Sequence, residues 1–268
     1  MLKMTRQLQQ FQTRTHGFPA IHLAAADDLG TVDPGNIAAI IIEPMIQGVN
    51  AMRPWPPGML RKLREWCDAN GVHLILDEVM TGFGRTGRMF ACQHEKVIPD
   101  FLCLAKGLTG GYLPLAATLT TEKIYSTFLG PAEKAFYYGH SYTANPLGCA
   151  AALASLELFT RENTLENLQP KILHLSERLA EMKSRHPVIH EVRQCGFAVG
   201  IELRQPDGER FPRGARTGEA VCREAGKRGL LTRPILDTIV LMPPLSITPQ
   251  ELDLAVSALD AAISSLGR

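Results

Sequence analysis

The stretch "LILDEVMTGFGRTGRMFAC" (residues 74–92), followed by "CLAKGLTGG" (103–111), decides the fold class of this chain. The apolar run of the first segment ends in Asp77 and Glu78, and that of the second ends in Lys106. A charged group at the end of a buried strand costs desolvation free energy unless an ionic partner or a ligand holds it. Both strand ends are therefore candidate functional positions.

Apolar runs alternate with segments of helical period through the first 160 residues. We predict buried strands in "NIAAIIIEP" (36–44), "VHLILDEV" (72–79), "DFLCLAKG" (100–107) and "LPLAATLT" (113–120), and a helix in "PPGMLRKLREWCDANG" (56–71). This alternation predicts an α/β fold with a mostly parallel sheet buried on both faces. Ligands of such sheets bind beyond the carboxyl ends of the strands, where Glu43, Asp77, Glu78 and Lys106 are expected.

The pattern changes after about residue 160. We expect helices at 145–159, 164–185 and near 215–228, strands in "RQCGFAVGIEL" (193–203) and "LLTRPILDTIVLMPP" (230–244), and a last helix whose capping box pairs Thr248 with Glu251. The sequence thus predicts an atypical segment (1–35), a large domain (36–160) and a small α+β domain (161–268).

Composition narrows the class of protein. The 268 residues include 28 basic and 27 acidic side chains, and the net charge of +1 does not suggest a nucleic-acid partner. We expect no membrane span and no secretion signal, and therefore a cytoplasmic protein. The six cysteines are scattered without metal-ligand spacing, so we expect reduced thiols and no metal site.

The pair of Asp77 and Lys106 has two interpretations. A lysine among small residues can form a Schiff base with an aldehyde, and a neighbouring buried carboxylate can keep the ring nitrogen of pyridoxal phosphate protonated. The same pair could be a buried ion pair without chemistry. A phosphate-binding loop of the GxxxxGK[ST] type is disfavoured, because neither "GRTGR" nor "KGLTGG" matches it.

A third segment, "YYGHSYTANP" (137–146), favours the cofactor interpretation. It is a loop rich in hydroxyl groups that precedes a helix, where Ser141 or Thr143 and backbone N–H groups could bind phosphate oxygens. The alternative is an ordinary helix cap with turn residues.

Four segments in one order carry a family resemblance: "IIEPMIQG", "LILDEVMTGFGRTGRMFAC", "PDFLCLAKGLTGGYLPLAATL" and "GHSYTANPLGCAAALASLELF". Together they resemble the class III pyridoxal-phosphate aminotransferases of fold type I. The wording of the last two is most similar to the branch that acts in biotin synthesis. The resemblance implies an enzyme that transfers an amino group to 8-amino-7-oxononanoate and gives 7,8-diaminononanoate, with S-adenosylmethionine or lysine as the donor.

The resemblance also implies site residues. Lys106 would carry the cofactor and move the proton, Asp77 would pair with the ring nitrogen, and Val79 would pack on the ring. Gly139, His140 and Ser141 fall where the family places a partner-subunit loop over the cofactor phosphate, which implies a homodimer. Arg233 would bind the substrate carboxylate, a task suited to a bidentate guanidinium. Glu43 would be a carboxylate in the wall of the site.

Two features depart from the family pattern. Met80 stands where many class III enzymes have Gln, which indicates the biotin branch rather than ornithine or aminobutyrate aminotransferases. Residues 1–35 show no counterpart of the family's amino-terminal portion, so we expect a truncated product, half of a split enzyme, or a noncatalytic relative. Another class III ω-aminotransferase or an aminomutase is the alternative activity.

Overall fold

A computed structural model describes residues 26–267 of the chain. Contacts between Cα atoms divide the chain into two units, residues 1–37 and residues 38–268. The described part of the first unit contains two 3-10 helices, η1 (Ala26–Thr31) and η2 (Pro34–Asn36). The predicted atypical segment (1–35) lies largely outside the described residues.

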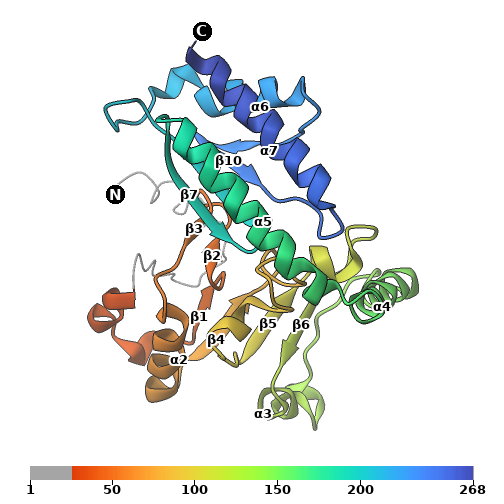
Figure 1. Cartoon of the computed structure of the whole chain (residues 1–268). Helices are drawn as coiled ribbons and strands as arrows, with labels where there is room; N and C mark the ends of the chain where they lie inside the picture. Colours follow the sequence, from red (N-terminus) through yellow and green to blue (C-terminus); the bar gives the residue numbers. More distant parts are fainter. Residues whose placement is uncertain (1–25, 268) are drawn as a thin grey trace. The chain divides into compact units, whose positions relative to one another are not determined.

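The first sheet of the second unit contains four of the predicted elements (Figure 1). Its strands are β1 (Ala39–Ile42), β4 (His73–Asp77), β5 (Phe101–Leu104) and β6 (Ala117–Thr120), in the order β1-β4-β5-β6. The pairs β1–β4 and β4–β5 are parallel, and β5–β6 is antiparallel. The prediction of a mostly parallel sheet is thus confirmed, and β4 and β5 present their carboxyl ends at the same edge.

The prediction of buried strands is wrong for residues 36–44 and 113–120, which form the two edges of the sheet; three of the four residues of β6 are exposed, and Leu119 is 51% exposed. Strand β1 lies at the edge of the sheet, where its residues alternate between exposed and half-buried, and Ile41 is 65% exposed. An apolar run alone does not tell a central strand from an edge strand, because that difference depends on which strands pair with it.

Helices and short strands lie between the strands of this sheet and after β6. They are β2 (Ile46–Gln47), β3 (Arg53–Pro54), α2 (Met59–Asn70), η3 (Ala91–His94), η4 (Lys106–Thr109), α3 (Glu122–Tyr125), η5 (Ser126–Phe128), η6 (Ala132–Lys134) and α4 (Pro146–Arg161). Helix α2 buries Leu60, Leu63 and Cys67, which share one helical face, and it ends at Gly71 with φ +65°. The end of this helix, predicted at residue 71, is confirmed.

A second sheet lies in the C-terminal part of the chain. Its strands are β7 (Ile189–Cys195), β8 (Ala198–Leu203), β9 (Pro234–Ile235) and β10 (Thr238–Leu241), which pair antiparallel in the order β7-β8-β10-β9. The segment "RQCGFAVGIEL" contains the end of β7, a turn at Gly196 with φ +61°, and β8. The left-handed turn residue lets the chain reverse within two residues.

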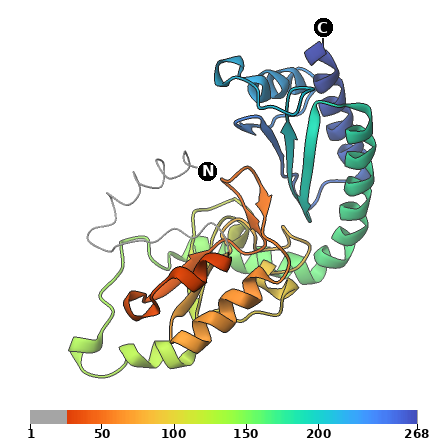
Figure 2. The ribbon, with the colours of Figure 1, turned by 90° about the vertical axis from the view of Figure 1, so that its left-hand side faces the viewer.

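Helices α5 (Thr164–Arg185) and α7 (Pro249–Ser264) cover one face of this second sheet (Figures 1 and 2). Helix α6 (Thr217–Gly226) packs against α7, and η7 (Arg213–Ala215) and η8 (Ser265–Gly267) complete the C-terminal elements. The capping box of Thr248 and Glu251 is confirmed, because Thr248 Oγ1 accepts from Glu251 N and Glu251 Oε2 accepts from Thr248 N. The division into domains at about residue 160 stays a prediction.

On the other face of the second sheet lies the β2–β3 hairpin. Ile46 and Met52 of this hairpin form a buried cluster with Ala198 of β8 and Val240 of β10. A Cβ atom on Gly200 would stand 2.7 Å from Cβ of Met52, so glycine is required for this close approach. The hairpin therefore connects the second sheet with the strand ends of the first. None of the helices that the structure describes is long and apolar enough to cross a membrane.

Candidate active site

Asp77 is the last residue of β4, where it pairs in register with Cys103 of β5. Its side chain is half-buried, and Oδ1 accepts a hydrogen bond from the backbone N–H of Val79 at 3.1 Å. Strand β4 ends at Asp77, so Val79 lies in the following turn and the expectation that it continues the strand face is wrong. One carboxylate oxygen of Asp77 thus binds a neighbouring backbone N–H, and the other, Oδ2, is available to a ligand.

Lys106 follows β5 by two positions and begins the 3-10 helix η4. Its backbone has φ +43°, a left-handed conformation that costs a non-glycine residue about 1–2 kcal/mol. The side chain is exposed and forms no ion pair with any residue that the structure describes. The alternative of a buried Asp77–Lys106 ion pair is therefore not observed, and the amine is free to react.

Glu43 is the third charge of this edge. It follows β1, and its Oε2 accepts a hydrogen bond from Gly48 N at 3.0 Å. Burial raises the pKa of Glu43, the N–H of Gly48 lowers it, the charge of Asp77 raises it and the charge of Lys106 lowers it, with a net upward shift. Because β1, β4 and β5 pair in parallel, the residues that follow them lie at one edge of the sheet, as the sheet rule predicts.

Met80 contacts the same corner. A Cβ atom on Gly48 would stand 2.5 Å from Sδ of Met80 and 3.2 Å from Oε1 of Glu43, so the thioether packs directly on the Gly48 backbone. A thioether sulfur donates no hydrogen bond, and Met80 therefore contributes an apolar wall beside Glu43.

Arg85 is a half-buried charged residue that sequence analysis did not single out. It lies in the loop after β4, and its Nη1 donates to the backbone oxygens of Pro243 at 2.6 Å and Phe197 at 3.3 Å. Burial lowers the pKa of its guanidinium, and no carboxylate of the described residues pairs with it. The loop thus binds the C-terminal part of the chain through Arg85. The only sequence signal at this position is the segment "GFGRTGR", and its composition does not predict which residues Arg85 contacts.

The carboxyl-end geometry fits pyridoxal phosphate in the part that the structure describes. A half-buried carboxylate stands at the end of β4, and a free, exposed amine stands at the end of the neighbouring strand. Gly107 follows Lys106 directly, and Gly110 and Gly111 come three residues later, so few side chains lie beside the amine along the chain. These are the two groups that the aldehyde and the ring nitrogen of the cofactor require.

Comparison with known proteins identifies the family. The family model "Aminotransferase class-III" matches residues 4–263. The chain belongs to the class III aminotransferase family. The match begins within the segment 1–35, further toward the amino terminus than the motifs that carry the resemblance.

Several individual relatives agree. The chain is 50% identical over 236 residues to the adenosylmethionine-8-amino-7-oxononanoate aminotransferase of Aquifex aeolicus, which covers 86% of this chain and 52% of that protein. It is 49% identical over 231 residues to the enzyme of the same name from Nitratidesulfovibrio vulgaris, a match that covers 85% of this chain and 42% of that protein. The chain thus spans about half the length of the curated relatives it matches.

Solved structures show the same fold. The crystal structure of the enzyme of this name from Methanocaldococcus jannaschii superimposes with a TM-score of 0.87 at 43% identity, covering 92% of this chain and 59% of that one. A PLP-bound amine transaminase from an uncultivated Pseudomonas species superimposes with a TM-score of 0.83 at 37% sequence identity. This match covers 89% of this chain and 55% of that one. The prediction of fold type I is confirmed.

In the described part of this class III aminotransferase, no hydrogen bond or ion pair joins the predicted phosphate loop to Asp77 or Lys106. Gly139, His140 and Ser141 are exposed, and the hydrogen bonds of His140 stay within the loop: its N–H donates to Thr143 Oγ1 at 2.9 Å, and its Nδ1 accepts from Tyr142 N at 3.2 Å. The roles of Gly139, His140 and Ser141 stay predictions. A loop that serves a partner's site would be exposed in a single chain.

Arg233 lies between α6 and β9 in the C-terminal part. Its side chain is exposed and pairs with no carboxylate among residues 26–267, while its carbonyl oxygen accepts from Val240 N at 3.2 Å. The backbone of Arg233 is thus fixed, whereas the N–H groups of its guanidinium have no partner among the described residues. Its role toward a substrate carboxylate stays a prediction.

Proposed function

We propose that this chain carries the cofactor-binding half of an aminotransferase of biotin synthesis, which transfers an amino group to 8-amino-7-oxononanoate. The observation that carries the proposal is that Asp77 and Lys106 lie at the carboxyl ends of the paired parallel strands β4 and β5. The names of its relatives, at 38–50% identity, support the choice of substrate. Bound pyridoxal phosphate supplies an electron sink for amino transfer.

The residues of the chain have distinct tasks in this proposal. Lys106 Nζ would hold the cofactor and later accept and donate the proton that moves during transfer. Asp77 would keep the ring nitrogen protonated, because a neighbouring carboxylate stabilises a positive charge. Val79 would pack on the ring, and Arg233 would bind the substrate carboxylate through two parallel hydrogen bonds.

The experiment is covalent trapping. The full chain is incubated with pyridoxal phosphate, reduced with borohydride, digested and analysed by mass spectrometry. We expect the added mass on the peptide that contains Lys106, and none at that position in Lys106→Ala. Lys123→Ala, which removes a lysine of α3 outside the site, should label at Lys106 like the parent chain. Absence of labelling at Lys106 would refute the cofactor site.

A second candidate is another ω-aminotransferase, favoured by the likeness to the amine transaminase at 37% identity. The two activities differ in the carbonyl compound that accepts the nitrogen. The chain loaded with the amino form of the cofactor is therefore offered 8-amino-7-oxononanoate, pyruvate and an aromatic ketone separately. Preference for the first supports the biotin reaction. A chain that traps the cofactor but turns over none of them would fit a truncated product, half of a split enzyme or a noncatalytic relative.

We further infer a homodimer, supported by exposed apolar residues of α4 and the loop before it. Leu147 and Leu153 of α4 are 74% and 68% exposed, and Tyr137 and Tyr138 of the loop are 84% and 77% exposed. Apolar groups so concentrated on one helix and its loop favour a protein partner. The loop also carries His140 and Ser141, which would reach the partner's cofactor.

The dimer is tested by sedimentation velocity. Leu153→Glu places a charge on the exposed face of α4 and should shift the chain to monomer, because a buried unpaired charge opposes association. Leu254→Glu, at a leucine of α7 that is 71% exposed, is the matched control and should leave the dimer intact. A monomeric parent chain would contradict the inference. The compartment stays a prediction.

A further inference from the structure

Glu78 is a buried charge that the proposed reaction does not use. It follows Asp77, its exposed fraction is 0%, and no Lys, Arg or His of the described residues forms an ion pair with it. Three hydrogen bonds hold its carboxylate instead: Thr81 Oγ1 donates at 2.6 Å, Ala91 N at 2.9 Å and Cys92 N at 2.8 Å. A carboxylate with this many donors can remain buried without a cation.

The donors come from both ends of one loop. Thr81 begins the segment 81–92, and Ala91 and Cys92 close it, so a single carboxylate ties its two ends together. The backbone of Glu78 adds to this fixation, since its oxygen accepts from Gly82 N at 2.9 Å and its N–H donates to Cys103 O at 3.0 Å on β5. The loop is therefore fastened to the strand that leads to Lys106.

Two aromatic residues extend this contact toward Lys106. Phe90 precedes the two backbone donors, and its ring meets that of Phe83 edge to face, with the centroids 5.6 Å apart. Phe83 is 4% exposed, and a Cβ atom on Gly107 would stand 2.8 Å from its Cβ. Phe83 thus packs on the backbone of the residue that directly follows Lys106.

We propose that Glu78 is a positioning residue for Lys106, acting through the loop 81–92 and the contact of Phe83 with Gly107. A left-handed backbone at a lysine persists only where its surroundings hold it. The packing of Phe83 on Gly107 supplies that support, and the hydrogen bonds of Glu78 keep Phe83 in place. This inference rests on the proposed function, in which Lys106 is the reactive amine.

The first test measures Lys106 in the full chain without cofactor. Trace acetylation with acetic anhydride, read by mass spectrometry, gives the reactivity of Lys106 relative to exposed Lys123. Glu78→Gln keeps the volume but turns an amide NH₂ toward backbone donors, so the loop should loosen. We expect the ratio of Lys106 to Lys123 labelling to change by about threefold, because a loosened loop would no longer hold the reacting amine in one position.

Glu95→Gln is the matched control. Glu95 is also a buried carboxylate that accepts backbone N–H groups, from Gly58 at 2.7 Å and Arg61 at 2.9 Å, but these belong to α2 and its N-cap. Both variants should lower the thermal midpoint, whereas only Glu78→Gln should alter the labelling ratio. Phe83→Leu, which keeps Glu78, should alter the ratio in the same direction as Glu78→Gln.

A second measurement is the rate of trapping of pyridoxal phosphate on Lys106. We expect Glu78→Gln to slow it by about tenfold, because small displacements of a reacting group reduce rates strongly. If Glu78→Gln and Glu95→Gln give the same labelling ratio, the inference is wrong. If the parent chain traps no cofactor but its acetylation ratio depends on Glu78, the proposed function fails while the positioning role stands.

Discussion

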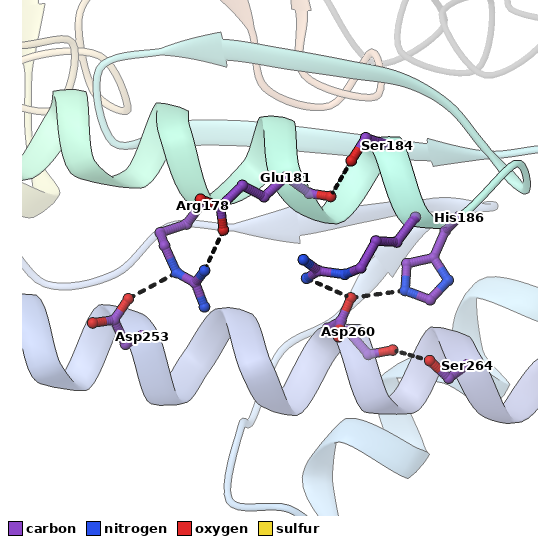
Figure 3. A network of polar contacts seen from close by, with 8 residues as sticks. Arg178, Glu181, Ser184, His186, Asp253, Asp260 and Ser264 are labelled. Carbon is purple, nitrogen blue, oxygen red and sulfur yellow. Dashed lines mark hydrogen bonds and ion pairs between the residues drawn. The ribbon is translucent and has the colours of Figure 1, made fainter.

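Nε2 of His186 lies 2.7 Å from Oδ1 of Asp260, an interaction that joins the end of α5 to α7 (Figure 3). Arg185 Nη2 donates to the same oxygen at 3.1 Å. Toward the other end of the two helices, Arg178 pairs with Asp253 at 2.9 Å and with Glu181. Two acidic residues of α7 thus bind basic residues of α5 over the core of the second sheet.

These contacts predict a pH-dependent stability. Burial raises the pKa of Asp260, but His186 and Arg185 lower it more, so the folded pKa lies below the ordinary value. A depressed pKa contributes stability above the unfolded value near about 3.9, and that stability is lost as the pH falls through the folded pKa. Asp260→Asn should therefore lower the free energy of unfolding by about 1 kcal/mol at pH 7 and by less near about pH 3.

Urea unfolding at about pH 7, 5 and 3 measures this difference. Asp68→Asn is the control, because Asp68 forms an ion pair with Arg64 at 2.8 Å but its side chain is 66% exposed, and such pairs contribute little. Equal effects of the two substitutions at pH 7 would contradict the prediction.

Gly196 is predicted to resist substitution. Its φ is +61°, and a Cβ atom would stand 2.4 Å from the carbonyl carbon of Thr86 and 2.7 Å from Arg85 O. Gly196→Ala should lower the free energy of unfolding by roughly 3 kcal/mol, because backbone strain and a steric clash combine. Gly208→Ala isolates the strain, since Gly208 has φ +85° and nothing within 4 Å of the new atom, and should cost about 1 kcal/mol.

Asp77→Asn should weaken the binding of pyridoxal phosphate by about tenfold, because the amide carries no charge to stabilise a protonated ring nitrogen. The fold should persist, since the amide oxygen can still accept from Val79 N. Titration of the chain with cofactor, followed by absorbance, gives the affinity. Asp207→Asn, in an exposed turn, is the control. Unchanged affinity in Asp77→Asn would remove Asp77 from the site.

Arg233→Lys should raise the KM for the keto acid by about tenfold and leave trapping of the cofactor at Lys106 unchanged, because an ammonium cannot form the two parallel hydrogen bonds of a guanidinium. Rates at several concentrations of 8-amino-7-oxononanoate separate KM from kcat. Arg213→Lys, in the exposed η7, should behave like the parent chain. A parallel loss of cofactor trapping would point to a structural role for Arg233.

The cysteines should differ in reactivity. Burial raises the pKa of Cys67 to about 11, and burial with the charge of Glu78 raises that of Cys92 to about 12. At pH 8 their thiolate fraction is on the order of one in a thousand or less, so iodoacetamide should label both more slowly than half-exposed Cys149. Peptide mass spectrometry measures the rates, and urea should make the six cysteines alike. Equal native rates would contradict the buried placement.

The sequence determined the sheet and the positions of its charges. Apolar runs ending in Asp77 and Lys106 predicted two parallel strands whose carboxyl ends meet, and β4 and β5 confirm this, because alternating strands and helices allow few other arrangements. The helix at 164–185 and the cap at Thr248 were equally local, since caps and periodicity depend on nearby residues.

Only the tertiary structure decided which groups are buried and what they contact. In the structure, β1 is an exposed edge strand and Lys106 forms no ion pair with a described residue. Arg85 donates to the carbonyl oxygens of Phe197 and Pro243, which lie more than 100 residues away in the sequence. Glu78 adjoins Asp77 in the sequence, but its carboxylate binds both ends of the loop 81–92 instead of facing the site. Successive residues at a strand end face opposite sides, so one carboxylate meets the site and the other meets the core.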